Sequence, residues 1–287
     1  IALGLVWLAV SATLRPLNSL RQAVAARASD DLKPLPDTEL PLELKPLVGA
    51  INQFNDRLRG LFERQSQFIA DASHELRTPL AALKARVELG LRAQDPETWR
   101  STLAQAAQSA EKLTHLANQL LSLARIESGA RALTEGGALR LDLSQLAREL
   151  GMALAPLAHA RGVALALEAD APVWLRGEPT LLNELLSNLV DNAIAHSPPG
   201  STVILRVKPD GVLEVEDDGP GIPEAEREQV FKRFYRSRNE GLGAGLGLAI
   251  VGEICSAHQA RISLQQVLPH GLLVRVEFSQ LAPEHGP

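Results

Sequence analysis

The segment around His74 carries side chains whose types and spacing suit phosphoryl chemistry. Residues 68–80 read FIADASHELRTPL and lie within an apolar pattern of helical period. At ~100° per residue, His74 lies roughly 150° from the stripe through Ile69, Leu76 and Leu83. The imidazole is therefore expected to face water.

A neutral imidazole beside a carboxylate can act as a nucleophile toward phosphorus. The ring titrates near neutral pH, so much of it is uncharged in a cell, and a neighbouring carboxylate can orient it and accept its proton. Glu75 supplies such a carboxylate, and Thr78 follows His74 by one turn on the same outer face. Pro79 leaves the carbonyl of Glu75 without its helical donor, which predicts a bend just after the histidine.

Two later segments could bind phosphates and a metal ion. Residues 184–193 (ELLSNLVDNA) predict a helix with Asn188 and Asn192 one turn apart on one face. Two such amides can reach phosphate oxygens and a hydrated Mg²⁺, which prefers oxygen ligands and retains waters. Residues 241–250 (GLGAGLGLAI) place glycines before an apolar helical run, and the free N–H groups at a helix start bind phosphate well.

A carboxylate at the end of a predicted strand could recognise a base. In residues 215–223 (VEDDGPGIP), Asp217 can accept a hydrogen bond from an adenine amino group, while Gly219 and Gly221 let the backbone approach closely. Each motif alone has a plain alternative. Helical asparagines are usually solvent contacts, a DxGxG string is commonly a turn, and a GxGxxG-like string without a preceding Rossmann strand is weak.

Taken in order, the motifs resemble those of membrane-bound sensor histidine kinases of two-component systems. HELRTPL is similar to their H-box. Residues 184–193, 215–223, 231–236 (FKRFYR) and 241–250 resemble, in that order, the N, G1, F and G2 boxes of a Bergerat-fold ATP-binding domain. The resemblance implies that His74 is the phosphoacceptor, Glu75 the general base, and Thr78 a residue that positions water in a phosphatase reaction. It also implies ATP and Mg²⁺ as cofactors. Their implied contacts are Asn188 to phosphates, Asn192 to Mg²⁺, Asp217 to adenine with Gly219 and Gly221 shaping its loop, Arg236 to the γ-phosphate, and Gly243, Gly245, Gly247 and Leu248 in the lid and phosphate turn.

The sequence departs from the family pattern at two places. Many relatives carry a lysine or arginine followed by tyrosine just after the position of Asn192, but residues 193–197 here are AIAHS. One basic phosphate contact is therefore in doubt, and whether His196 replaces it is open. Residues 237–242 are short for an ATP lid, so limited loop closure is expected.

Two other functional classes share parts of this pattern. ATPases of the gyrase, Hsp90 and MutL type place a water-activating glutamate one turn before the metal-binding asparagine, where this chain has Asn188. Without a base there, hydrolysis is expected to be slow, which leaves the γ-phosphate for another nucleophile. A non-enzymatic coiled-coil relay with a degenerate nucleotide domain is disfavoured because His74, Asn192, Asp217 and the glycines are all present.

Composition and the first residues limit the location and partners. A net charge of -5 without a long basic run gives no reason to expect direct binding of nucleic acid, and the single Cys255 excludes an internal disulfide framework. Residues 1–14 are uncharged but shorter than the ~20 apolar residues of a spanning helix. We expect the chain to begin inside a helix of the inner or plasma membrane, with Arg15 and all that follows cytoplasmic. A buried soluble helix is the alternative.

The predicted architecture is multidomain, with an all-α part followed by an α+β domain. After the membrane segment, residues 15–64 resemble a HAMP relay module and residues 65–129 a helical hairpin for dimerisation and histidine phosphotransfer. The second hairpin helix should begin at Asp95-Pro96, and its seam should be buried in a homodimeric four-helix bundle. Residues 137–283 should form the Bergerat-fold α/β sandwich. The resemblance implies an aspartate of a response regulator as the phosphoryl acceptor. The predicted seam comprises Leu103, Ala106, Ala110, Leu113, Ala117, Leu120 and Ala124, and strands are predicted at 203–207, 212–216 and 272–278.

Overall fold

The structure, a computed structural model, describes residues 3, 4, 7, 31–35, 44–93, 95–236 and 245–279. The chain divides into two compact units, residues 1–71 and 72–287. Most of the predicted membrane segment, with Arg15, and residues 16–30 and 36–43 of the HAMP-like segment lie outside the described residues. Among the helices that are described, none combines the length and the apolar character needed to cross a membrane.

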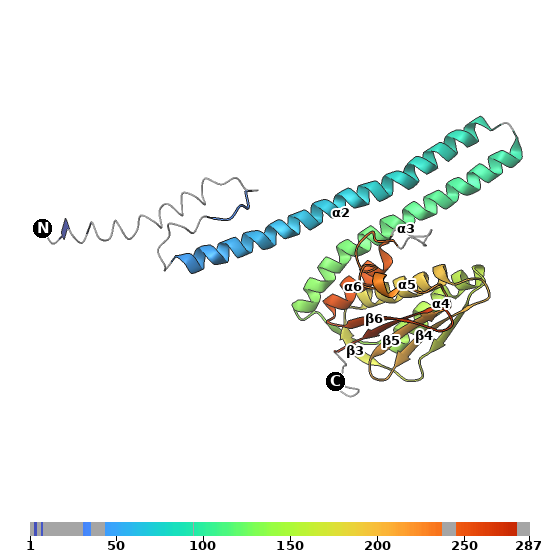
Figure 1. The fold of residues 1–287 in the computed structure, drawn as a ribbon. Helices are drawn as coiled ribbons and strands as arrows, with labels where there is room; N and C mark the ends of the chain where they lie inside the picture. The colour runs from blue at the N-terminus through green and yellow to red at the C-terminus, as the bar shows by residue number, and fades with distance from the viewer. Residues whose placement is uncertain are drawn as a thin grey trace. The chain divides into compact units, whose positions relative to one another are not determined.

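In the first unit, residues 31–35 pair with one side of the long helix α2 (Lys45–Arg92; Figure 1). The side chain of Asn52 accepts a hydrogen bond from the Leu35 N–H at 2.6 Å and donates to the Leu35 carbonyl at 2.9 Å. Arg59 donates to the carbonyl of Leu32. Two polar side chains of the helix, Asn52 and Arg59, therefore hold the backbone of residues 31–35.

Helix α2 continues through two places where the sequence predicts a change. It is uninterrupted at residue 64, where a domain boundary is predicted, and at Pro79, while the bend predicted just after His74 stays a prediction. The hydroxyl of Thr78 donates to the His74 carbonyl at 3.4 Å, so a side chain interacts with the helical backbone beside the proline. A proline inside a helix removes one backbone hydrogen bond and does not by itself end the helix.

Helix α3 (Pro96–Thr134) begins where the sequence predicts, because Asp95 caps it. The Asp95 carboxylate accepts a hydrogen bond from the Thr98 N–H at 2.7 Å, and this bond lowers the pKa of the Asp95 carboxyl. Arg86 of α2 donates to the Gln105 carbonyl at 2.7 Å and to the Ser109 hydroxyl at 2.6 Å, which fixes the antiparallel register of the hairpin.

The seam predicted for α3 is only partly buried in the single chain. Ala106 is buried, whereas Leu103 and Ala110 are exposed, and Leu121 is also exposed. Two packed helices can bury only one side of each helix. The remaining apolar side of α3 therefore stays on the surface of the hairpin.

The C-terminal domain is built on a mixed five-stranded sheet with the order β2-β4-β5-β7-β6, in which only β2 and β4 pair in parallel. A separate two-stranded antiparallel sheet joins β1 and β3. The strands predicted from the sequence correspond to β4, β5 and β7, and the predicted fold class is confirmed. The elements are β1 (Leu139–Asp142), α4 (Leu143–Ala160), β2 (Ala164–Glu168), β3 (Trp174–Gly177), α5 (Pro179–His196), β4 (Thr202–Lys208), β5 (Val212–Asp217), the 3-10 turn η1 (Glu224–Glu226), α6 (Gly247–Ala257), β6 (Arg261–Gln266) and β7 (Leu272–Glu277).

The two faces of the five-stranded sheet differ in character. Helices α4, α5 and α6 pack on one face and enclose the apolar core (Figure 1). Cys255 is buried in this core, and burial raises the pKa of its thiol to about 12, so the thiol stays protonated. The opposite face carries ion pairs across neighbouring strands, in which Arg206 bonds Glu168 and Glu216, while Lys208 and Arg275 both bond Glu214. The sandwich thus has two layers.

The buried His258 is expected to make the stability of the domain depend on pH. Its Nδ1 lies 3.0 Å from the Ile254 carbonyl and its Nε2 lies 3.1 Å from the Glu178 N–H, so the ring is neutral with its proton on Nδ1. Burial lowers the pKa of His258 from 6.5, although the Glu178 carboxylate opposes this. The unfolded chain then binds this proton more readily, so the free energy of unfolding should fall as the pH drops below about 6.5.

Chemical denaturation between pH 5 and 8 would measure this effect. His258→Ala should cost about 2–4 kcal/mol at pH 8 through two lost hydrogen bonds and a cavity, and it should flatten the pH dependence. The exposed His159→Gln is the matched control and should keep both the stability and the slope. An unchanged slope in His258→Ala would contradict this assignment.

Candidate functional site

His74 lies on the surface of α2, as the sequence predicts. Its side chain is 76% exposed, and its Nδ1 lies 3.5 Å from Oε1 of Glu75. The carboxylate thus faces one ring nitrogen and leaves Nε2 toward solvent. Thr78 is likewise exposed, one turn further along the helix. The three side chains predicted for this motif are therefore brought together on one exposed helix face.

Helix α5 places Asn188 and Asn192 one turn apart, and both are partly buried. The amide nitrogen of Asn188 donates to the Glu184 carbonyl at 2.9 Å and to Oε1 of the Glu184 carboxylate at 3.0 Å. Glu184 is a residue that sequence reasoning missed, although its spacing of four residues before Asn188 could have indicated the contact. It holds the Asn188 side chain in one orientation.

Asp217 closes β5 as a buried carboxylate. Its Oδ1 accepts hydrogen bonds from the N–H groups of Gly219 at 2.8 Å and Leu272 at 3.3 Å, which leaves Oδ2 to accept from a ligand. Burial raises the pKa of Asp217 above its ordinary value, and the two backbone donors oppose this. A Cβ on Gly219 would lie 2.8 Å from Oδ1 of Asp217, so the turn requires glycine here.

His196 lies near Asp217. Its carbonyl oxygen would lie 3.1 Å from a Cβ on Gly219, and its side chain is near enough to oppose, electrostatically, the rise in the pKa of the Asp217 carboxyl. His196 therefore lies beside Asp217 and Gly219, which are predicted to form the adenine site. Gly221 of the same loop has a φ of +72°, and a side chain there would meet Gln266.

The glycine turn before α6 is held by the segment that precedes it in the sequence. The Phe234 N–H donates to the Gly245 carbonyl at 2.9 Å, and Gly245 has a φ of +69° with no room for a Cβ against the Tyr235 carbonyl. Arg236 follows directly and is exposed. Gly247 and Leu248 form the first residues of α6, while Gly243 and the predicted short lid lie outside the described residues.

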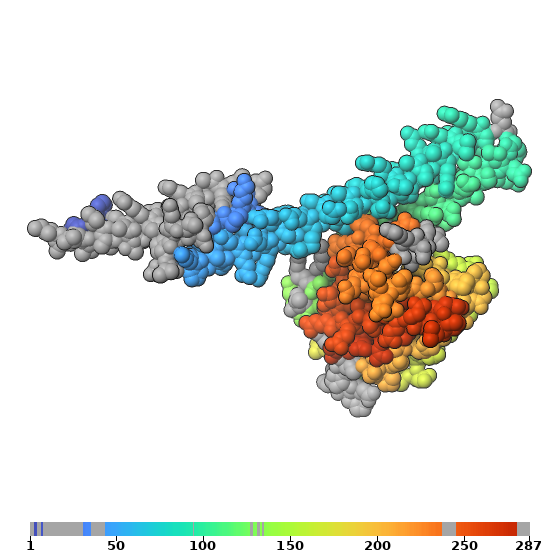
Figure 2. Space-filling model, in the orientation of Figure 1, coloured from blue at the N-terminus to red at the C-terminus, as the bar shows by residue number. Residues whose placement is uncertain are grey.

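The start of α6 lies beside α5 and beside the hairpin helix α3. Oδ1 of Asn188 lies 3.5 Å, and Nε2 of Gln119 4.0 Å, from the point where a Cβ on Gly247 would stand. Ser122, one turn after Gln119, donates to Oε1 of Glu184 at 2.7 Å. The space-filling view shows the orange surface around α6 against the hairpin (Figure 2). Sequence reasoning missed Gln119 and Ser122, because contacts between distant segments leave no periodic signal.

The hairpin register relates this contact to His74. Gly90 packs against Thr102, and Arg86 bonds Ser109, so each step back along α2 corresponds to a step forward along α3. From Arg86 back to His74 is about three helical turns, and three turns forward from Ser109 along α3 reach the neighbourhood of Gln119. His74 and Gln119 therefore lie at about the same height in the hairpin. The glycine turn therefore contacts the hairpin at about the height of the histidine.

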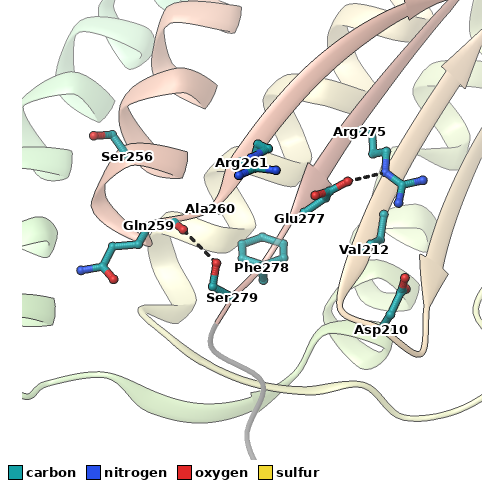
Figure 3. A pocket seen from close by; sticks show the side chains of 10 residues that line it. All are labelled: Asp210, Val212, Ser256, Gln259, Ala260, Arg261, Arg275, Glu277, Phe278 and Ser279. Atoms are coloured by element: carbon teal, nitrogen blue, oxygen red, sulfur yellow. Dashed lines mark hydrogen bonds and ion pairs between the residues drawn. The ribbon is translucent and has the colours of Figure 1, made fainter.

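A recess of about 760 Å³ lies on the domain away from the residues predicted to bind the nucleotide (Figure 3). Two of its charged side chains, Arg275 and Glu277, form an ion pair at 2.8 Å. None of the residues predicted to bind the nucleotide lines it. The lining comprises Asp210, Val212, Ser256, Gln259, Ala260, Arg261, Arg275, Glu277, Phe278 and Ser279.

Three family models match consecutive parts of the chain. Residues 14–60 match the HAMP domain of PhoQ-like sensor proteins, residues 64–129 the His Kinase A phospho-acceptor domain, and residues 177–281 the histidine kinase-, DNA gyrase B- and HSP90-like ATPase. The chain belongs to the family of two-component sensor histidine kinases.

Individual relatives agree with this class. The chain is 34% identical to the sensor protein BasS of Salmonella typhimurium over 90% of its own length and 71% of that protein. It is 35% identical to the sensor protein kinase PmrB of Pseudomonas aeruginosa over 98% of its length, but it spans only 59% of PmrB. Among solved structures, Acinetobacter baumannii histidine kinase AdeS is similar with a TM-score of 0.52 and 25% identity, covering 72% of this chain and 98% of that one. Full-length ShkA in complex with AMPPNP has a TM-score of 0.54 and 26% identity, covering 76% of this chain and 46% of that one.

Proposed function

We propose that this chain phosphorylates its own His74 from ATP and passes the phosphoryl group to an aspartate of a response regulator. The observation that carries the proposal is the pairing of an exposed His74–Glu75 motif with a site of Asp217, two helical asparagines and a glycine turn in one chain. Contact between that turn and α3 near the height of His74 supports it further.

In the proposed reaction, Nε2 of His74 attacks the γ-phosphorus of ATP. An N–P bond forms, and the bond from that phosphorus to the bridging oxygen of ADP breaks, with its electron pair leaving on ADP. The ring proton on Nδ1 passes to Glu75, whose carboxylate lies 3.5 Å away. Asp217 would hold the adenine amino group through Oδ2. The N–H groups at the start of α6 would receive the phosphates, and Arg236 would approach the γ-phosphate.

The residues present fit Mg²⁺ as part of the bound nucleotide. Clusters of three or more His, Cys, Asp or Glu side chains able to hold a metal are absent from the described residues. Amide oxygens of Asn192 and Asn188, together with phosphate oxygens and water, would satisfy an ion that prefers oxygen ligands. The ion would neutralise charge on the transferred phosphoryl group.

ATP hydrolysis is the rival reaction, and the contacts of Glu184 disfavour it. An ATPase of this fold needs a carboxylate that can activate water, but Asn188 occupies the expected position. The Glu184 carboxylate, one turn earlier, is engaged by Ser122 and Asn188. A carboxylate held by two donors is a poor base.

Several further features of the proposal come from the family. They are dimerisation of the hairpin into a four-helix bundle, phosphatase activity involving Thr78, and anchoring in the inner or plasma membrane through the N-terminal segment. The exposed apolar side chains of α2 and α3, such as Leu80 and Leu103, support the dimer. No direct contact with nucleic acid is proposed.

Incubation with γ-labelled ATP and Mg²⁺ tests the proposal against its rivals. A kinase would retain label on the protein that is labile in acid and stable in alkali. Free phosphate without protein label would indicate an ATPase, and neither product would indicate a non-enzymatic relay.

Glu75→Gln tests the proposed base separately. The amide can still lie near Nδ1 but cannot accept its proton, so labelling of the protein should slow by ~10²–10⁴-fold while nucleotide affinity stays unchanged. Glu88→Gln, an exposed glutamate of the same helix, is the matched control and should label at the normal rate. Normal labelling of Glu75→Gln would remove this residue from the mechanism.

A further inference from the structure

The Asn188 side chain presents one defined atom to the glycine turn. Its amide nitrogen lies between two acceptors of Glu184, the backbone carbonyl and the carboxylate, and an amide has only two N–H groups to donate. Both are therefore used. The remaining atom, Oδ1, faces Gly247 at the start of α6.

This orientation decides what Asn188 can bind. An amide oxygen repels a phosphate oxygen but accepts a hydrogen bond from metal-bound water or coordinates a cation directly. In this orientation Asn188 acts on the Mg²⁺ that accompanies the nucleotide, and a contact of its N–H groups with phosphate would require loss of the Glu184 bonds. The Glu184 carboxylate thus shares with the Glu184 backbone carbonyl the role of orienting Asn188, and only the carboxylate can be changed by substitution.

The same carboxylate oxygen also receives a hydrogen bond from the hairpin. The single hydroxyl proton of Ser122 in α3 has two acceptors in reach, the Asn118 carbonyl at 3.0 Å and Oε1 of Glu184 at 2.7 Å, and the shorter bond to the charged carboxylate is the stronger. Leu123 and Ile126 are buried in the same contact. Close packing continues at Gly129, where a Cβ would lie 2.8 Å from Leu181 of α5. Gln119 is 9% exposed and its Oε1 lacks a hydrogen-bond partner among the described residues, so α3 brings a second polar group to this place.

We propose that Glu184 is a positioning residue that couples contact with α3 to binding of the Mg²⁺–nucleotide complex. The inference rests on the proposed function for the identity of the ligand. When α3 contacts the domain, Ser122 fixes the Glu184 carboxylate, which fixes Asn188 with Oδ1 toward the cation. By linkage, the Mg²⁺–nucleotide complex favours contact with α3 by the same factor. The hairpin that carries His74 therefore takes part in binding the nucleotide.

Nucleotide binding to the full chain, measured by calorimetry with AMPPNP, tests the coupling. With Mg²⁺, Ser122→Ala should weaken binding about three- to tenfold, and Glu184→Ala about ten- to a hundredfold, since bonds to a charged group are lost. With EDTA in place of Mg²⁺, both variants should bind as the parent chain does. Glu184→Gln keeps an acceptor oxygen for Ser122 and should retain most of the affinity.

Matched controls separate positioning from folding. Ser101→Ala removes a hydroxyl that bonds only within α3 and should bind normally. Binding in EDTA serves as the measure of a folded site. Equal affinity of Ser122→Ala, Glu184→Ala and the parent chain in Mg²⁺ would overturn the proposal, as would an equal loss with and without the metal. Because the measurement is binding, failure of the parent chain to label His74 would refute the proposed reaction without affecting this result.

Discussion

Asp217→Asn is expected to weaken ATP binding by about ten- to a hundredfold. Oδ1 of Asp217 accepts bonds from Gly219 and Leu272, and Oδ2 would accept from the adenine amino group. Both oxygens must be acceptors, whereas an amide supplies one acceptor and one donor. In the variant, the amide NH₂ therefore faces another hydrogen-bond donor, either the backbone N–H groups or the adenine amino group. Loss of a hydrogen bond to a charged group typically lowers affinity by about ten- to a hundredfold.

The pH dependence of binding provides a second measurement at the same residue. Because burial raises the pKa of Asp217, its carboxyl should take up a proton at a higher pH than an ordinary aspartate, and ATP affinity should fall there as the pH is lowered. Calorimetric titration of the protein with ATP at a series of acidic pH values would measure this fall in affinity. The exposed Asp170→Asn serves as the control with normal affinity and the same pH dependence. Normal ATP affinity in Asp217→Asn would exclude the proposed adenine contact.

His74→Gln is expected to lower the rate of protein phosphorylation by about a thousandfold or more, because the nucleophile is removed. ATP affinity should not change, since the side chain is 76% exposed and is not among the residues proposed to hold the nucleotide. Labelling and calorimetry on the same preparation would measure both quantities. The exposed His159→Gln should label normally. Persistent acid-labile label in His74→Gln would place the phosphoacceptor elsewhere.

Local patterns in the sequence predict much of this fold. The cap at Asp95 marks the start of α3, and alternating apolar residues mark β4, β5 and β7. The outward position of His74 follows from helical periodicity alone. These features depend on residues a few positions apart, which is the range over which sequence patterns report structure.

Contacts between distant segments were not predictable in the same way. Ser122 and Glu184 are 62 positions apart, and nothing in either local pattern indicates that they meet. His258 was missed for the same reason, because its bond to the Glu178 N–H joins α6 to the start of α5. Helix α2 also runs on past residue 64, because a boundary between two predicted domains does not require a break in the helix that joins them.

The most direct test of the central claim is to locate the phosphate after the full chain reacts with Mg²⁺ and ATP. Peptides prepared at alkaline pH and analysed by mass spectrometry should carry a phosphoryl group on a ring nitrogen of His74. Phosphate found on a different side chain, or a fully unmodified His74 peptide from a preparation that binds ATP, would contradict the account.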